Sequence, residues 1–293
     1  MNDGGMDYIA ALEALGKWAE RTDSVRGVLV TGSAAAGDVH PLSDRDIEIY
    51  THDVESLLED ESWWNGLGEV LVVERLANGL GPPTRLIYYV GGKLDFTLIP
   101  ASDLATAVHT RPFQVLVDKD ACAPPSPSTV KTPNLPGPDE VDKVINWGYA
   151  AALMCAKAIV RDELWSAKLR DNDLKGELLR MIELDHQLRY GPSIDTRYLA
   201  TRMNTWMDAD IRDELSHCWS HFDAADTAAA LRRTTALFSR LSDRVATALG
   251  LPHFDHERLI SEIEHILQMR EDQPPGPSTA AAHRGTNVAE QHL

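Results

Sequence analysis

The chain has 293 residues, of which 43% are apolar and 25% charged, and these values are typical of a globular protein with one large or two ordinary domains. Its formal net charge of -17 argues against a nucleic-acid partner, because phosphate binding relies on basic patches, and favours a small cationic ligand. The three cysteines are far apart without a CxxC pair, which argues against a disulfide framework and a thiolate zinc site.

The first half of the chain is predicted to be a strand-rich domain that opens with a helix. Residues 7–21 carry a single apolar stripe at helical spacing, and residues 54–64 also have helical spacing. Alternating or β-branched apolar runs predict strands over residues 25–31, 46–51, 69–76, 84–90, 93–99 and 113–117.

The pair Gly91-Gly92 lies between two predicted strands and indicates a tight hairpin. A two-residue loop of type I′ needs a positive φ at both positions, which glycine adopts without strain. With these residues as the loop, Asp95 is expected to lie opposite Tyr88. Asp95 is the one acid in an otherwise apolar strand, and buried acids are rare unless they are paired or bind a metal ion. Asp95 is therefore a candidate site residue.

The second half of the chain is predicted to be helical. Dense prolines in residues 123–138 exclude regular structure and indicate a linker between domains. The last residues have too little apolar content to pack and are expected to be disordered. Helical periodicity predicts helices over residues 139–169, 174–189, 223–249 and 254–269. We therefore expect an α+β protein with a mixed-sheet domain at 1–137, an α-helical bundle domain at 138–270 and a disordered tail at 271–293.

An acidic strand follows a glycine-serine turn. The apolar run 25–31 ends in Gly32-Ser33, and a polar loop leads from there to Asp44, Asp46 and Glu48. Side chains at i and i+2 of a strand share a face, so these acids are expected on one side while the intervening isoleucines enter the core. Adjacent carboxylates repel each other, so a fold gains little from them unless a cation lies between. The alternative is a capped turn followed by a strand that happens to be acidic.

Together with Asp95, these residues form the outline of a metal-nucleotide site. Clustered carboxylates can hold a divalent cation that bridges the oxygens of a nucleotide. Gly32 allows a phosphate to approach the backbone closely, and Ser33 offers a hydroxyl and an N–H donor. This ordered combination predicts a phosphoryl-type transfer that depends on a divalent cation.

The same residues carry a family resemblance. The stretch GSAAAGDVHPLSDRDIEIY resembles the glycine-serine to Asp-x-Asp signature of polymerase-β-type nucleotidyltransferases. The blocks KLDFTLIPASDL, VLVDKD and GELLRMIEL resemble the streptomycin (aminoglycoside 6-) adenylyltransferase family in the same order, and the resemblance extends from about residue 25 to about residue 191. It implies a mixed-sheet nucleotidyltransferase domain followed by a helical domain, with ATP and Mg²⁺, and transfer of AMP to an aminoglycoside hydroxyl with release of pyrophosphate.

The resemblance also implies roles for residues of the first domain. Gly32 and Ser33 would bind the triphosphate, and Asp44 and Asp46 would hold the magnesium ions. Asp95 would take a proton from the acceptor hydroxyl, bind metal, or both. An alcohol is a poor nucleophile near neutral pH, so the reaction needs a base or a metal within hydrogen-bond reach.

Candidates in the second domain lie near the start of its second predicted helix. Lys168, Arg170 and Lys175 are candidates for contact with the triphosphate, and the alternative for each is an ordinary solvated face. Glu177 and Arg180 also have the i, i+3 spacing of a surface ion pair. The residues expected to grip a cationic acceptor through charge and cation–π contact are Trp165, Asp171, Asp173 and Glu177.

These patterns predict a cytoplasmic, monomeric enzyme that adenylylates an aminoglycoside, with streptomycin as the expected acceptor and antibiotic resistance as the outcome. The acidic N-terminus lacks the basic and apolar regions of a signal peptide, and no run approaches the roughly 20 apolar residues that cross a bilayer. Two alternatives stay open. One is a nucleotidyltransferase of the same fold that acts on a lincosamide, another small alcohol, a protein or a tRNA end. The other is a non-catalytic nucleotide-binding module.

Overall fold

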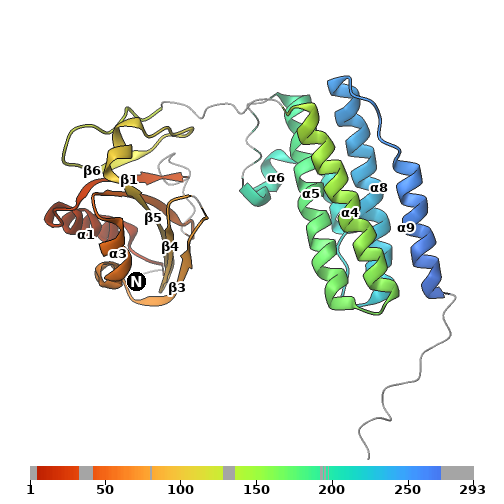
Figure 1. Cartoon of the computed structure of the whole chain (residues 1–293), viewed down its shortest axis with the longest axis horizontal. Helices are drawn as coiled ribbons and strands as arrows, with labels where there is room; N and C mark the ends of the chain where they lie inside the picture. The colour runs from red at the N-terminus through yellow and green to blue at the C-terminus, as the bar shows by residue number, and fades with distance from the viewer. Residues whose placement is uncertain are drawn as a thin grey trace, which may run out of the picture. The chain divides into compact units, whose positions relative to one another are not determined.

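The computed structural model divides into two compact units, Met1–Thr132 and Pro133–Leu293 (Figure 1). The first unit holds a sheet and the second is helical, which confirms the predicted α+β class. No helix among the described residues is both long enough and apolar enough to cross a membrane. Residues 272–293 of the predicted tail and residues 128–135 of the predicted linker lie outside the described part of the chain. The structure describes residues 5–32, 42–79, 81–127, 136–191, 194, 196 and 198–271.

The first unit is built on a six-stranded mixed sheet with the strand order β3-β4-β5-β2-β1-β6. Among these strands the central β2–β5 pair is parallel and the other neighbours are antiparallel. Each predicted strand is confirmed to within one residue at either end. The strands are β1 (Val25–Thr31), β2 (Arg45–Thr51), β3 (Val70–Leu76), β4 (Thr84–Tyr89), β5 (Gly92–Pro100) and β6 (Gln114–Asp118).

Helix α1 (Tyr8–Arg21) covers one face of the sheet. Every second side chain of the strands points to this face and packs with the apolar side chains of the helix in one buried core. The helix begins after Asp7, whose carboxylate accepts a hydrogen bond from the Ala10 N–H at 3.0 Å. The isoleucines between the acids of β2 enter this core, as predicted. The buried side chains on this face include Leu15, Val28, Ile47, Ile49, Leu94, Phe96 and Leu98.

The predicted helix at 54–64 is two elements. Helix α3 (Val54–Glu59) and the 3₁₀ helix η1 (Glu61–Leu67) meet at Asp60, whose side chain accepts a hydrogen bond from the Ser62 N–H at 3.0 Å. Aspartate favours a cap over a helix interior because its side chain competes for backbone N–H groups. Trp63 then stacks on Trp18 of α1 with ring centroids 4.8 Å apart, which holds η1 against the same face of the sheet.

The hairpin between β4 and β5 is confirmed, but its predicted loop is wrong by one residue. The loop is Val90-Gly91, so Asp95 lies opposite Leu86 instead of Tyr88. Gly91 has the positive φ, 79°, that the turn requires. Gly92 is needed for packing, because a Cβ there would come within 2.6 Å of a side-chain atom of the N-terminal segment. The partner of Asp95 moves by two residues, so its side chain keeps the predicted face.

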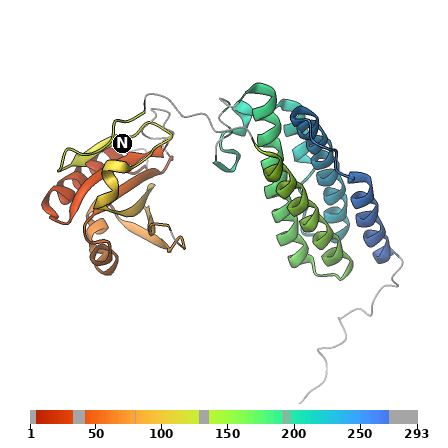
Figure 2. The ribbon, with the colours of Figure 1, turned by 45° about the horizontal axis from the view of Figure 1, so that its top comes forward.

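The second unit is a helical bundle, as predicted, and its long helices lie alongside one another (Figure 2). They are α4 (Pro138–Val160), α5 (Leu164–Tyr190), α8 (Ala224–Leu249) and α9 (His256–Glu271). Between α5 and α8 lie the short elements η3 (Tyr198–Ala200), α6 (Met203–Trp206) and α7 (Ala209–Ser216). The core is apolar and includes Ile145, Ala152, Cys155, Leu178, Ile182, Leu231, Phe238 and Leu241.

The predicted break between the first two helices of this unit is in the wrong place. The helices were expected to part between residues 169 and 174, but the chain turns at Asp162, which has a φ of 57°. The Glu163 N–H donates to the Ala158 carbonyl at 2.9 Å, and α5 then begins and packs along α4. The turn contains neither glycine nor proline, so no local signal marks it.

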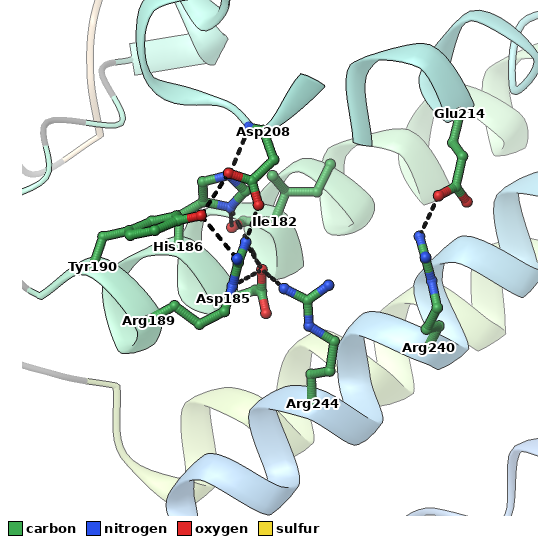
Figure 3. Close-up of polar contacts among 9 residues, drawn as sticks. All are labelled: Ile182, Asp185, His186, Arg189, Tyr190, Asp208, Glu214, Arg240 and Arg244. Carbon is green, nitrogen blue, oxygen red and sulfur yellow. Dashed lines mark hydrogen bonds and ion pairs between the residues drawn. The ribbon is translucent and has the colours of Figure 1, made fainter. Parts of the chain in front are cut away.

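A buried carboxylate ties three elements of the second unit together (Figure 3). Asp185 of α5 is 2% exposed and accepts hydrogen bonds from Arg189 at 2.9 Å and from Arg244 of α8 at 2.8 Å. Arg189 also pairs with Asp208, directly before α7, and Nε2 of His186 accepts the Asp208 N–H at 3.1 Å. The segment that leads into α7 is therefore held on α5 by charge and hydrogen bonds.

Asp185→Ala is expected to lower the free energy of unfolding by roughly 2–3 kcal/mol, because it leaves two guanidinium groups without their shared buried partner. Both arginines are about a third exposed, so the loss stays below that of a fully buried pair. Chemical denaturation followed by circular dichroism measures it. Glu214→Ala is the matched control, because Glu214 and Arg240 form an exposed pair whose loss should cost under about 1 kcal/mol. Equal losses in the two variants would contradict the role given to Asp185.

Candidate active site

Two acids meet where the parallel strands β2 and β5 pair. Asp46 is in register with Asp95, and β1 places Thr31 beside Asp46 on the other side. Side chains in register on neighbouring strands project from the same face of a sheet. Because Ile47 and Phe96 enter the helix-covered core, Asp46 and Asp95 project from the opposite face.

Gly32 follows β1 directly and leaves space for the carboxylate of Asp46. Its φ is 71°, and a Cβ at this position would overlap the Asp46 Oδ2 and lie 2.9 Å from the Cγ. A residue with a side chain would therefore be strained and would displace the carboxylate. Ser33, which was predicted to bind the triphosphate with Gly32, lies outside the described residues.

Lys93 lies between two of the acids. Its Nζ donates to the Asp44 Oδ2 at 3.0 Å and to the Asp95 Oδ2 at 2.9 Å, and the Lys93 and Asp95 side chains are each 17% exposed. The Lys93 backbone N–H donates to the Tyr8 hydroxyl at 3.0 Å. Lys93 is not among the site residues predicted from the sequence. The available signal was its position two residues before Asp95 on the same strand, which places both side chains on one face.

Burial and neighbouring charges change how readily these groups ionise. Burial raises the pKa of Asp46, and the nearby Asp44 carboxylate adds to the rise. Burial also raises the pKa of Asp95, and the Lys93 ammonium offsets part of this. For Lys93, burial opposes the charged form, but the hydrogen bonds to Asp95 and Asp44 outweigh it and raise its pKa. The lysine therefore stays a cation at neutral pH, while the two acids ionise less readily than exposed ones.

Glu48, the second acid of β2, already has hydrogen-bond partners. Its Oε2 accepts the Tyr50 hydroxyl at 2.8 Å and lies 2.8 Å from the His109 Nε2. His109 lies in the loop before β6, and no motif in the sequence marks it as a partner of Glu48. Because the carboxylate of Glu48 is engaged in these hydrogen bonds, Glu48 is left out of the candidate metal site, which then consists of Asp44, Asp46 and Asp95.

Four of the predicted residues of the helical unit share one face of α5, next to the segment 219–222. Lys168 donates to two backbone carbonyls of this segment. Lys175 forms a buried ion pair with Asp171, and its Nζ lies 4.9 Å from the ring centroid of Trp219. The fourth residue of this face, Trp165, contacts the end of the same segment.

The exposed predicted residues of α5 have looser contacts. Trp165 is 73% exposed, and its ring meets that of Phe222 edge-on with centroids 6.4 Å apart. Arg170 donates to Asp173 at 3.0 Å in a half-exposed i, i+3 pair. Pairs of this kind contribute little to stability, so both side chains can move toward a ligand.

Glu177 is the last predicted residue of this helix. Burial raises the pKa of its carboxyl group, and Lys143 and Arg180 offset part of the rise. Arg180 has the spacing of an ion pair with Glu177, but it donates to Glu183 at 3.1 Å and to Glu140. Glu177 follows Lys175 by two residues in α5, a spacing that places the two side chains on different faces of the helix.

A sequence model of the family described as streptomycin adenylyltransferase matches residues 9–266, a range that spans both units. The chain belongs to this family. It is therefore an adenylyltransferase, an enzyme that transfers AMP from a nucleotide substrate to an acceptor, and the predicted family is confirmed. The match continues well beyond residue 191, where the resemblance seen in the sequence blocks ends.

Comparisons of this adenylyltransferase with known sequences and with solved structures each match most of its length. An aminoglycoside 6-adenylyltransferase of Bacillus subtilis (strain 168) is 25% identical over 262 residues, which cover 82% of this chain and 90% of the relative. The crystal structure of an aminoglycoside 6-adenyltransferase from Bacillus subtilis has 21% sequence identity and a TM-score of 0.44, and the match covers 87% of this chain and 98% of that one.

The acids of this adenylyltransferase have the donor chemistry of a divalent-cation site. Carboxylate oxygens are the ligands that Mg²⁺ prefers, and the Asp95 Oδ1 is buried without a hydrogen-bond partner. Within the described ranges, no three His, Cys, Asp or Glu side chains converge as they would around a metal ion. Asp44 and Asp95 each place one carboxylate oxygen on the Lys93 ammonium.

Proposed function

We propose that this adenylyltransferase transfers AMP from magnesium-bound ATP to a hydroxyl group of an aminoglycoside, with streptomycin as the first acceptor to test, and so confers antibiotic resistance. The observation that carries the proposal is the alignment of Asp46 with Asp95 across the parallel β2–β5 pair, with Asp44 two residues earlier. The strand pair and the residue directly before β2 thereby contribute three carboxylates to one region of the sheet. The family description and the similarity to the Bacillus subtilis enzyme support the class of acceptor.

Each acid is given a role by its position. Asp44 and Asp46 would hold Mg²⁺, which would neutralise part of the negative charge that develops on the phosphate during transfer. Asp95 would take the proton of the acceptor hydroxyl, because burial raises its pKa and makes it a stronger base than an exposed acid, and it would also offer a carboxylate oxygen to the metal ion. The hydroxyl oxygen then bonds to the α-phosphorus while the bond to pyrophosphate breaks in line.

The helical unit offers its own candidates for binding a cationic acceptor or a phosphate. The net charge of -17 attracts a polycationic acceptor, and the exposed Trp165 and Asp173 offer an aromatic face and a carboxylate. Arg170 is free to reach a phosphate at the small cost of a surface pair. Lys175 would have to give up its buried pair with Asp171, so its predicted contact with the triphosphate is the more costly one.

Incubation of the purified protein with ATP, Mg²⁺ and a panel of acceptors tests the proposal. We expect mass spectrometry to find an AMP adduct on streptomycin together with released pyrophosphate. Asp44→Asn should give no adduct while it keeps the wild-type melting temperature, because the half-exposed Asp44 carboxylate contributes little to the core.

The other outcomes of this assay identify the alternatives. Absence of an adduct on every aminoglycoside would overturn the acceptor class. An adduct on a lincosamide would identify an enzyme of the same fold with another acceptor. Binding of ATP by calorimetry, with no adduct on any acceptor, would identify a non-catalytic nucleotide-binding module.

A further inference from the structure

Lys93 occupies a position that none of the roles above explains. Its ammonium lies 3.0 Å from Asp44 and 2.9 Å from Asp95, between two residues proposed to serve the reaction. Its backbone N–H is held by the Tyr8 hydroxyl, and its Nζ lies 5.2 Å from the ring centroid of Tyr88. The backbone of Lys93 is therefore anchored, whereas its long side chain can change position by rotation alone.

We propose that Lys93 is a resident counter-ion of the metal site: its ammonium holds Asp44 and Asp95 together in the metal-free enzyme, and a divalent cation displaces it from both. The inference rests on the metal site of the proposed function and names the residue that competes with the metal there. Without a cation, the carboxylates of β2 and β5 would repel one another on neighbouring strands.

The contacts of Asp95 support displacement rather than a permanent ion pair. Asp95 uses its Oδ2 for Lys93, while its Oδ1 is buried without a hydrogen-bond partner. A buried carboxylate oxygen without a hydrogen-bond donor lowers the stability of the folded protein, so the Asp95 Oδ1 is suited to accept a second ligand. Lysine suits the task because its charge is compact and its stem flexible, so the ammonium can leave without a backbone movement.

Competition for the same oxygens links metal affinity to stability. Removal of the ammonium should destabilise the metal-free protein, because the carboxylates are left to repel one another. It should leave the metal-saturated protein unchanged, because the metal has already replaced the ammonium. The affinity for the metal must then rise by the factor that closes the thermodynamic cycle.

Lys93→Met tests this linkage, because it keeps an unbranched stem and removes the charge. We expect the Kd for Mn²⁺, measured by calorimetry on the full chain without nucleotide, to fall roughly fivefold or more. The Tm of the variant should lie below that of the wild type in EDTA and equal it at saturating Mn²⁺. Lys93→Arg, which keeps a cation at this position, should stay close to the wild type in both measurements.

Two control variants test whether the changes in Mn²⁺ affinity and Tm arise at the Lys93 site. Lys119→Met removes a lysine whose ammonium donates to the Thr22 carbonyl at 2.8 Å, so its change in Tm should be the same with and without Mn²⁺. Asp95→Asn, added to Lys93→Met, should abolish the gain in affinity if the metal binds at this site.

Three results would overturn the inference: an unchanged Kd in Lys93→Met, an equal loss of Tm with and without Mn²⁺, or no Mn²⁺ binding by either protein. Failure of the proposed function is detected by a different experiment. It appears as a missing AMP adduct in the assay with ATP and acceptors, whereas the metal titration uses neither.

Discussion

Asp95→Asn is expected to lower kcat for adenylyl transfer about 10²–10⁴-fold, the range typical for the loss of a general base, while the protein stays folded. Asparagine keeps the shape of the side chain beside Asp46 but cannot take a proton. Burial opposes the charged form of Asp95 in the wild type, so the neutral amide should leave the Tm close to its wild-type value. Steady-state kinetics at saturating ATP and acceptor measures kcat, and thermal unfolding in EDTA measures stability.

Glu48→Gln is the matched control for Asp95→Asn. Glu48 lies on the same face of β2, but its carboxylate is already engaged by Tyr50 and His109, and glutamine can still accept these hydrogen bonds. Its kcat should change far less than that of Asp95→Asn. Wild-type kcat in Asp95→Asn would show that Asp95 is not the base and that the proton leaves the acceptor by another route.

Gly32→Ala is expected to lower activity about 10²-fold, because the added methyl group would push the Asp46 carboxylate out of place, and small displacements of catalytic groups have effects of this size. The positive φ of 71° adds a loss of stability of roughly 1–2 kcal/mol. Kinetic assays and chemical denaturation measure the two effects separately.

Gly79→Ala separates the strain of the backbone from the displacement of Asp46. Gly79 also has a positive φ, 59°, but a Cβ there would meet nothing within 4 Å. We expect a similar loss of stability and wild-type activity. If Gly79→Ala lost as much activity as Gly32→Ala, general destabilisation would explain the effect and the contact with Asp46 would not.

Local patterns in the sequence were enough to specify the strands of the sheet and the buried faces of β2 and its neighbours. The alternation in β2 sends Ile47 and Ile49 to the core and the acids to the other face, because successive strand residues point to opposite sides. Both ends of α8 were also predictable from single residues. Asp223 caps the N-terminus of the helix, and Gly250 ends the helix with a φ of 67°. These signals depend on residues close together in the chain.

The pairing of distant segments could not be read from such patterns. Asp46 and Asp95 become neighbours because β5 pairs in parallel with β2, and this choice also brings Lys93 between the acids. The hairpin loop shifts because Gly92 packs against the N-terminal segment, and the chain turns at Asp162 so that α5 can pack along α4. Each of these features depends on the burial of whole faces against one another, a contribution that outweighs the preferences of short segments and involves residues far apart in the chain.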